Sequence, residues 1–204
     1  MLKIISFLGA DGAGKSTLLK LLETDLKYRT SKVKIKVIHF KPTIRKNNID
    51  GIVLPYNKKP HNLFISVAKL IVWYCEYILF FIIMFLENIF SDLVVIFDRH
   101  LIDIKVDPLR YRMNNFVSRL PFYTFIFPKP DIIFYIDGEP KTINKRKIEV
   151  SLDETVQQIE RYRNILKNIK NVVVINNEQS IEDSYRIICK TVFKVLKIEN
   201  TTSA

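Results

Sequence analysis

The sequence predicts an α/β fold: a doubly wound, five-stranded parallel sheet with helices on both faces, giving three layers. Short apolar runs typical of buried parallel strands recur along the chain, and helical patterns separate them. A glycine-rich turn joins the first apolar run to the first helical pattern. Strands that alternate with helices pair in parallel through right-handed crossovers, so the order of the elements predicts this architecture.

The chain begins with a strand and a helix. Residues 2–8, LKIISFL, are β-branched and aromatic with one charge, as expected of a strand buried on both faces. After the turn, leucines recur on one helical face, at Leu18, Leu19, Leu22 and Leu26. The turn therefore lies between a strand and a helix.

The remaining elements follow the same alternation. Further strands are predicted at residues 33–40, 93–98, 131–137 and 171–176. Helices are predicted at residues 63–90, 151–166 and 180–196. Ser151, followed three residues later by Glu154, forms a capping-box pattern at the start of the second of these helices. Prolines and polar residues between 41 and 61 indicate a long surface loop.

Length and composition suit one domain. A chain of 204 residues that is 48% hydrophobic is long enough for one α/β core and short for two, so we expect residues 1–204 to form a single domain with a flexible tail at about 198–204. Cys75 and Cys189 lie far apart in apolar segments, which predicts reduced core residues. No signal-peptide pattern precedes the first strand, so we expect a cytoplasmic protein.

The formal net charge of +11 raises the question of a polyanionic partner. The lysines and arginines are spread over the whole sequence and fall mostly on helix faces. We therefore favour a biased composition and expect no nucleic-acid partner, a polyanion or membrane-surface contact being the alternative.

Residues 63–90 are the strongest membrane candidate in the sequence. Lys69, Glu76 and Glu87 interrupt the segment and leave 77–86 as its longest uncharged run, below the roughly 20 residues that a span requires. We expect no stable membrane insertion. Apolar residues on all sides of this helix predict instead a buried helix or a homodimer interface through residues 62–90.

The glycine-rich turn fits the pattern G-x-x-x-x-G-K-[ST]. Glycines let the backbone turn tightly and aim N–H groups inward, and the following helix adds unpaired N–H groups and its positive dipole end. The turn is therefore predicted to be a phosphate-binding loop. The residues expected to contact a bound nucleotide are Gly9, Asp11, Gly12, Ala13, Gly14, Lys15, Ser16 and Thr17.

Two groups of side chains carry the predicted chemistry. Lys15 is expected to reach the β- and γ-phosphates of ATP, and the hydroxyl of Ser16 to bind Mg²⁺. The segment VVIFDRH at residues 94–100 delivers Asp98 and Arg99 to the same edge of the sheet. Asp98 is expected to hold Mg²⁺ directly or through water, and Arg99 to bind an anionic acceptor.

The chain resembles the thymidylate kinase family of P-loop nucleoside monophosphate kinases across most of its length. The matching segments are GADGAGKST at 9–17, DRH at 98–100 and PKPDIIFYIDGEPKTINKRK at 128–147. The resemblance implies a three-layer P-loop NTPase fold and a lid at about 141–153. It also implies transfer of the ATP γ-phosphate to a small-molecule phosphate acceptor, dTMP in particular, with ATP and Mg²⁺ as cofactors.

The same resemblance implies roles for individual residues. Lys15, Asp98, Arg99 and Arg146 are the implied catalytic residues. Arg146 falls where the lid arginine of the family closes over the nucleotide, and Asp11 and Arg99 fall at positions that contact the acceptor.

The chain departs from the family where the acceptor is recognised. The family carries a serine and an Ala-Tyr-Gln group after its Asp-Arg pair, whereas this chain reads LIDIKVDPLRYR at 101–112. The family's Arg-Glu-Pro after the second strand is reduced to FKP at 40–42, and Glu76 lies where a phosphate-binding arginine is expected. The acceptor is therefore left open between a nucleoside monophosphate and another nucleotide, a nucleoside or a sugar hydroxyl.

Several alternatives follow from this departure. A hydroxyl acceptor would benefit from a nearby carboxylate, with Asp11, Asp98 and Asp103 as candidates. The loop residues Asp103, Asp107, Arg110 and Arg112 are predicted either to bind the acceptor or to form a surface ion-pair network. His39, His61 and His100 lack metal-binding spacing and are expected to be structural or to form hydrogen bonds.

A different class of function is a nucleotide-switched binding module. Such a protein would hold ATP or GTP and signal through a partner bound to the long apolar helix. The aromatic residues predicted to form that surface are Phe64, Trp73, Tyr77 and Phe81.

Overall fold

The computed structural model describes residues 1–30, 33–39, 59–120 and 129–197. In these residues one parallel sheet has the strand order β2-β3-β1-β4-β5. The strands are β1 (Leu2–Leu8), β2 (Val33–His39), β3 (Asp92–Asp98), β4 (Ile132–Asp137) and β5 (Val172–Asn176). The predicted five-stranded parallel sheet is thus confirmed, and Phe40, the last residue of the predicted second strand, lies outside the described residues.

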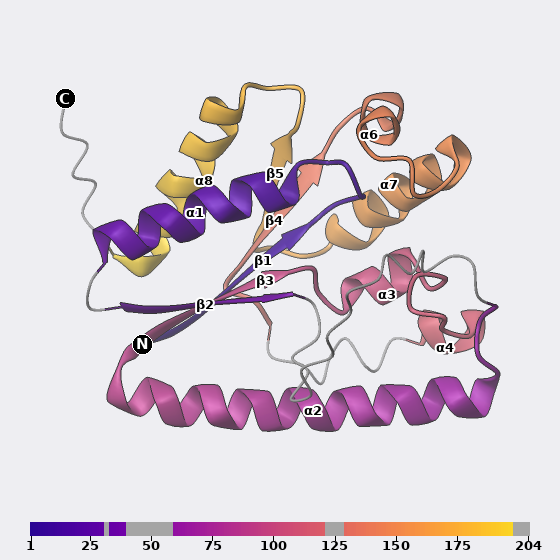
Figure 1. Cartoon of the computed structure of the whole chain (residues 1–204), viewed down its shortest axis with the longest axis horizontal. Coiled ribbons are helices and arrows are strands. Elements are labelled where there is room, and N and C mark those ends of the chain that lie inside the picture. The colour runs from indigo at the N-terminus through magenta and orange to yellow at the C-terminus, as the bar shows by residue number, and fades with distance from the viewer. Residues whose placement is uncertain (31–32, 40–58, 121–128, 198–204) are drawn as a thin grey trace.

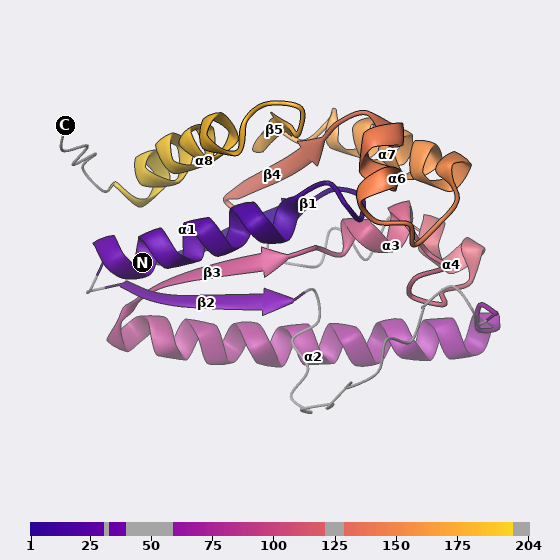
Figure 2. The same ribbon diagram turned by 45° about the horizontal axis from the view of Figure 1, so that its top comes forward.

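Helices cover both faces of this sheet, as Figures 1 and 2 show. The helices of the described residues are α1 (Lys15–Arg29), α2 (Leu63–Phe90), α3 (Ile102–Val106), α4 (Asn115–Arg119), α6 (Pro140–Arg146), α7 (Leu152–Leu166) and α8 (Ile181–Leu196). Alternate strand residues point to opposite faces, so one set packs against α1 and α8 and the other against α2, α3 and α7. The predicted three-layer, doubly wound arrangement is confirmed.

The first helix packs as its leucine spacing predicts. Its buried residues include Leu18, Leu19, Leu22 and Leu26, which join the core between α1, α8 and the sheet. Gly14 is the N-cap, so the helix begins directly at the end of the glycine-rich turn. The amino end of α1 is therefore directed at the carboxyl edge of the sheet, beside the end of β1.

The Ser151 half of the capping box predicted for α7 is present. The hydroxyl oxygen of Ser151 accepts a hydrogen bond of 3.2 Å from the main-chain N–H of Glu154. This cap fixes the point where the segment after α6 turns into α7. The predicted lid at 141–153 accordingly comprises most of α6, the connection after it and the first residues of α7. The tail at 198–204 and most of the loop at 41–61 lie outside the described residues.

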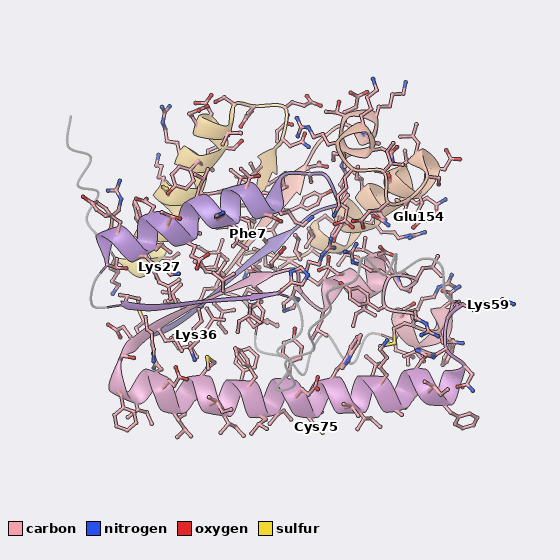
Figure 3. All side chains as sticks on the ribbon, viewed as in Figure 1. Phe7, Lys27, Lys36, Lys59, Cys75 and Glu154 are labelled. Carbon is pink, nitrogen blue, oxygen red and sulfur yellow. The ribbon has the colours of Figure 1, made fainter. Side chains whose placement is uncertain are left out.

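The long helix α2 lies along the second face of the sheet and is buried on one side only (Figure 1). Trp73 and Tyr77, predicted to form part of an exposed aromatic surface, are buried against the sheet instead. Cys75, predicted to be a core residue, is an exposed free thiol, while Cys189 is half-buried. Figure 3 labels Cys75 on the side of α2 that faces away from the sheet.

In the described part of the chain, α2 is long and apolar enough to cross a membrane by length and composition. Its most apolar window has a mean hydropathy of 2.0, and 22% of that window is buried. The three charged residues therefore do not shorten the helix below the length of a span, as the run at 77–86 suggested. Of the two alternatives predicted for this segment, a buried helix or a homodimer interface, the first is wrong within the chain, because only one side of α2 contacts the sheet.

Candidate phosphate-binding site

The loop between β1 and α1 requires glycine at particular positions. Gly12 and Gly14 have φ angles of 89° and 98°, in the left-handed region that side chains disfavour. A Cβ on Gly12 would lie 2.5 Å from the main-chain oxygen of Ile143 in α6, and one on Gly9 would lie 2.6 Å from that of Ile136. The loop thus packs closely against β4 and against the helix of the predicted lid.

Lys15 lies inside this loop. Its Nζ donates hydrogen bonds of 2.7 Å to the main-chain oxygens of Gly9 and Ala10. Burial, together with the charge of Arg99, lowers the pKa of the Lys15 ammonium to about 8, against the opposing effect of Asp11. A positive charge is therefore held in the centre of the loop, where the oxygens of a polyphosphate can replace the carbonyl partners.

Asp98 and Ser16 provide oxygen atoms beside the loop. Asp98 ends β3 in register with Phe7 of β1, and its Oδ2 lies 2.9 Å from Nδ1 of His39. Its Oδ1 is buried and has no hydrogen-bond partner among the described residues. Burial would raise the pKa of Asp98, but the hydrogen bond and charge of His39 and the charge of Lys15 outweigh it and lower that pKa.

These oxygens fit Mg²⁺. Asp98, with a carboxylate oxygen that has no partner in the part of the chain that the structure describes, and Ser16, with a hydroxyl in the first turn of α1, line one cavity, and Mg²⁺ prefers such hard oxygen ligands. Within the described residues, no group of three or more His, Cys, Asp and Glu side chains could hold a metal ion by itself. A magnesium ion here would therefore take further ligands from phosphates and water.

Arg99 connects the loop to a buried carboxylate. Its guanidinium donates one hydrogen bond to Asp11 in the loop and another, 3.2 Å long, to Asp103 in α3. Asp103 is 1% exposed and also accepts hydrogen bonds from the hydroxyl of Tyr162 and the main-chain N–H of His100. These acidic partners raise the pKa of Arg99 despite its burial, so it stays charged.

Arg110 is a second guanidinium at the loop. It donates hydrogen bonds to Asp11 and, at 3.2 Å, to Glu149 in the predicted lid. Burial would raise the pKa of Asp11, but the charges of Arg99, Lys15 and Arg110 lower it well below its usual range. Asp11 is therefore an anion held between two arginines.

Some charged residues of the loop after β3 are buried in the interior, and others lie at the cavity. Asp103 and Asp107 are buried, and Asp107 accepts hydrogen bonds from the main-chain N–H of Arg110 and the amide of Gln158. The predicted surface network is therefore wrong for these two residues, which lie in the interior. Arg112 donates to the main-chain oxygen of Lys59 at 3.2 Å.

One cavity of about 630 Å³ brings the predicted site residues together. Of the residues predicted from the sequence, it is lined by Asp11, Gly12, Ala13, Gly14, Lys15, Ser16, Thr17, Asp98, Arg99 and Arg146. Gly9 is outside this lining, because it packs behind the loop against β4. The phosphate-loop end, the β3 end and the predicted lid thus face a common space.

The cavity is also lined by residues that were not among the predicted site residues, including His39, which was expected to be structural or to form a hydrogen bond. His39 ends β2, Asn177 follows β5, and Lys147 follows Arg146 in the predicted lid. Both polar side-chain atoms of Asn177 are buried without a partner among the described residues. The signal that could have found His39 and Asn177 is position, because ligands in doubly wound sheets bind beyond the carboxyl ends of the strands.

Comparison with known proteins supports the fold. No family model matches the sequence. The structure is similar to that of a deoxyadenosine kinase from M. mycoides, solved with the products dCMP and a flexible dCDP bound. The TM-score is 0.55 at 16% sequence identity, over 94% of this chain and 99% of that chain. At this identity the likeness shows the fold alone: the chain has the fold of the P-loop kinases.

Proposed function

We propose that the protein is an ATP-dependent phosphotransferase that moves the γ-phosphoryl group of ATP to a nucleoside monophosphate, with dTMP as the first acceptor to test. The observation that carries this proposal is the convergence of Lys15, Arg99, Arg110 and Arg146 on one cavity beside a glycine loop. Several cations around a polyphosphate site are what phosphoryl transfer needs, because the protein contributes positioning and positive charge.

The donor side is the loop and the amino end of α1. Loop N–H groups and Lys15 would bind the β- and γ-phosphates of ATP, with Ser16 and Asp98 holding Mg²⁺. When bound, the metal ion supplies positive charge to the β- and γ-phosphate oxygens. Asn177, whose amide has no partner among the described residues, lies in the same cavity and offers an NH₂ donor group and a carbonyl acceptor for the edge of a nucleotide base.

The acceptor side is the pair of arginines around Asp11. Arg99 and Arg110 both bind this carboxylate, so the structure already contains an anion site with two guanidinium groups. An acceptor phosphate would share these cations with Asp11. Such a phosphate is already ionised, so the transfer requires no general base.

Arg146 and Lys147 are proposed to act from the predicted lid. Both are exposed and line the cavity, and Gly12 contacts α6 directly. A cation from this side would reach the transferring phosphoryl group opposite Arg99. Charge that develops on the phosphoryl oxygens would then meet cations on two sides.

A nucleoside or sugar hydroxyl is the second candidate acceptor. The specific observation in its favour is the pair His39–Asp98, 2.9 Å apart and directed into the cavity from the ends of β2 and β3. The similarity to a deoxyadenosine kinase points the same way. Asp103 is not a base for such an acceptor, because it is buried among Arg99, His100 and Tyr162 and does not line the cavity.

The test is an acceptor panel at saturating ATP and Mg²⁺, with ADP release as the readout. Deoxynucleoside and ribonucleoside monophosphates, the matching nucleosides and simple sugars would be compared. Release of ADP with monophosphates supports the first candidate, and release with nucleosides or sugars alone transfers the assignment to the second. Slow hydrolysis that no acceptor accelerates would contradict both and favour a nucleotide-switched binding module.

A further inference from the structure

A second cavity, of about 660 Å³, lies apart from the phosphate-binding site. It shares no described lining residue with the cavity at the glycine loop. Its walls are the start of α3, the beginning of β4 with the residues just before it, and the carboxyl end of α7 with the residues that lead to β5. Small-molecule sites occupy about 300–1,000 Å³, so this cavity has the size of a ligand site.

Isoleucines form the apolar part of the second cavity. Ile102 and Ile133 belong to the hydrophobic core between α3, β4 and α7, and Ile165 and Ile169 pack against that core. All four line the cavity. A ligand that covers these side chains removes apolar surface from water, which is favourable in proportion to the area buried. The cavity therefore suits a molecule with an apolar body, such as an aromatic ring or a short alkyl chain.

Three lysines give the same cavity a positive charge. Lys105 is half-buried, and Lys129 and Lys170 are exposed. Among the described residues that line the cavity there is no aspartate or glutamate. Burial lowers the pKa of the Lys105 ammonium, and an anion beside it would favour its charged form. The charge of the cavity is therefore complementary to an anionic ligand.

His100 adds unused hydrogen-bonding capacity to this cavity. The residue is 9% exposed and its ring lines the cavity. Its buried Nδ1 has no hydrogen-bond partner among the described residues. Buried polar groups in native proteins are nearly always hydrogen-bonded, so an imidazole left in this state needs an explanation. A polar atom of a ligand beside the ring would provide the hydrogen bond that the described residues do not.

We propose that the second cavity binds a small amphipathic anion, with its apolar body against the four isoleucines and its anionic group toward the three lysines. The combination carries the proposal, because an apolar wall alone would accept neutral molecules and surface lysines alone would accept any anion. Such sites bind with apolar contacts and gain specificity from a few polar groups. No residue of the glycine loop takes part, so the proposal does not depend on the proposed function.

NMR of the isoleucine δ1-methyl groups tests the location of the site in the full chain without nucleotide. On titration with 2-naphthoate, the signals of Ile102, Ile133, Ile165 and Ile169 should shift together, with a dissociation constant of about 1 mM or tighter. Single isoleucine-to-valine variants assign these signals. Octanoate is the second probe, and binding of either anion supports the proposal and identifies the preferred body.

Three outcomes of this titration overturn the proposal. The first is that neither anion shifts the four signals. The second is that the shifts are confined to isoleucines of α2, because the probe then binds the exposed apolar side of that helix. The third is displacement of the probe by ATP with Mg²⁺, because the probe then occupies the phosphate-binding cavity.

A neutral analogue and a charge reversal test the preference for an anion. 2-Naphthamide, which lacks the charge, should bind more weakly than 2-naphthoate. Lys170→Glu should weaken the binding of 2-naphthoate about tenfold or more, because it places a like charge at the cavity. Lys167→Glu is the matched control three residues earlier, does not line this cavity, and should keep the parent affinity. Equal affinities for acid and amide, or equal losses in the two variants, overturn the proposal.

Discussion

The side-chain nitrogen of Lys15 donates a 2.7 Å hydrogen bond to the main-chain oxygen of Gly9, at the opposite end of the same loop. The lysine is 5% exposed, and the loop encloses its charge. Because burial and Arg99 lower the pKa of Lys15 only to about 8, the ammonium remains mostly protonated at neutral pH. The loop therefore presents a fixed cation to the cavity.

Lys15→Ala should lower kcat by about 10²–10³, the loss found when a charge-stabilising donor is removed from an active site. The measurement is steady-state ADP release with the best acceptor of the panel. Lys20→Ala, at an exposed lysine of α1, is the control and should keep the parent rate. Near-normal turnover of Lys15→Ala would show that the loop lysine takes no part in transfer.

Arg110→Gln should raise KM for an anionic acceptor about tenfold or more, because it removes one of the two guanidinium groups at Asp11. Arg112→Gln is its matched control two residues away, since the Arg112 side chain donates to the main-chain oxygen of Lys59 and does not line the cavity. Acceptor titrations at saturating ATP separate the two variants. Equal KM values for the acceptor in the two variants would show that Arg110 does not bind the acceptor.

Arg146→Ala should lower kcat with little change in circular dichroism, because its exposed side chain lines the cavity from the predicted lid. Lys145→Ala changes the neighbouring exposed cation, which does not line the cavity, and should have little effect. A loss of about tenfold or more is expected if the arginine meets charge on the transferring group. A larger loss of kcat in Lys145→Ala than in Arg146→Ala would show that Lys145, and not Arg146, is the cation that acts from the lid.

Asp103→Ala should reduce the free energy of unfolding by about 3–5 kcal/mol, because it leaves the buried guanidinium of Arg99 without one of its two carboxylate partners. The variant also removes the acceptor for the Tyr162 hydroxyl. Urea unfolding followed by circular dichroism measures the loss. Glu178→Ala, at an exposed position, should be within about 0.5 kcal/mol of the parent protein. If Asp103→Ala also lies within about 0.5 kcal/mol of the parent protein, the buried network around Asp103 adds little stability.

Asp11 should make stability depend on pH in the acid range. Because its folded-state pKa lies below the usual value of 3.8, the carboxylate stabilises the fold above that value, and the contribution is lost as the pH falls through the folded pKa. Urea unfolding of the parent protein and of Asp11→Asn should differ most at pH 7, and the difference should shrink progressively as the pH falls below about 4 toward the folded pKa. A difference that is independent of pH would rule out this linkage.

The fold was predictable where the signal is local. The glycine pattern, the apolar run at Leu2–Leu8 and the leucine spacing of α1 each report their own backbone, and the structure confirms the strand, the loop and the helix in that order. The Ser151 cap is equally local and equally well predicted. In contrast, the burial of α2 depends on which side meets the sheet, and a helix that is apolar all round carries no such signal. Trp73 and Cys75 were therefore assigned to the wrong sides.

The site divides in the same way. The loop residues follow from one contiguous motif, and Asp98 and Arg99 follow from their place at the end of an apolar strand. The role of Arg110 was left open between acceptor binding and a surface ion-pair network. Its contact with Asp11 spans 99 positions in the sequence and depends on the packing of the loop after β3, so no local signal could reveal it. The burial of Asp103 was not predicted. A charged residue in a polar loop gives no sign in the sequence that it will be 1% exposed.

Isothermal titration calorimetry of the purified protein with ATP, in the presence of Mg²⁺, tests the central claim most directly. The expected result is one binding site per chain, weakened at least tenfold by Lys15→Ala and by removal of Mg²⁺ with EDTA. If neither ATP nor GTP produces binding heat with Mg²⁺ present, the loop does not hold a nucleotide and the proposed phosphotransferase activity is contradicted.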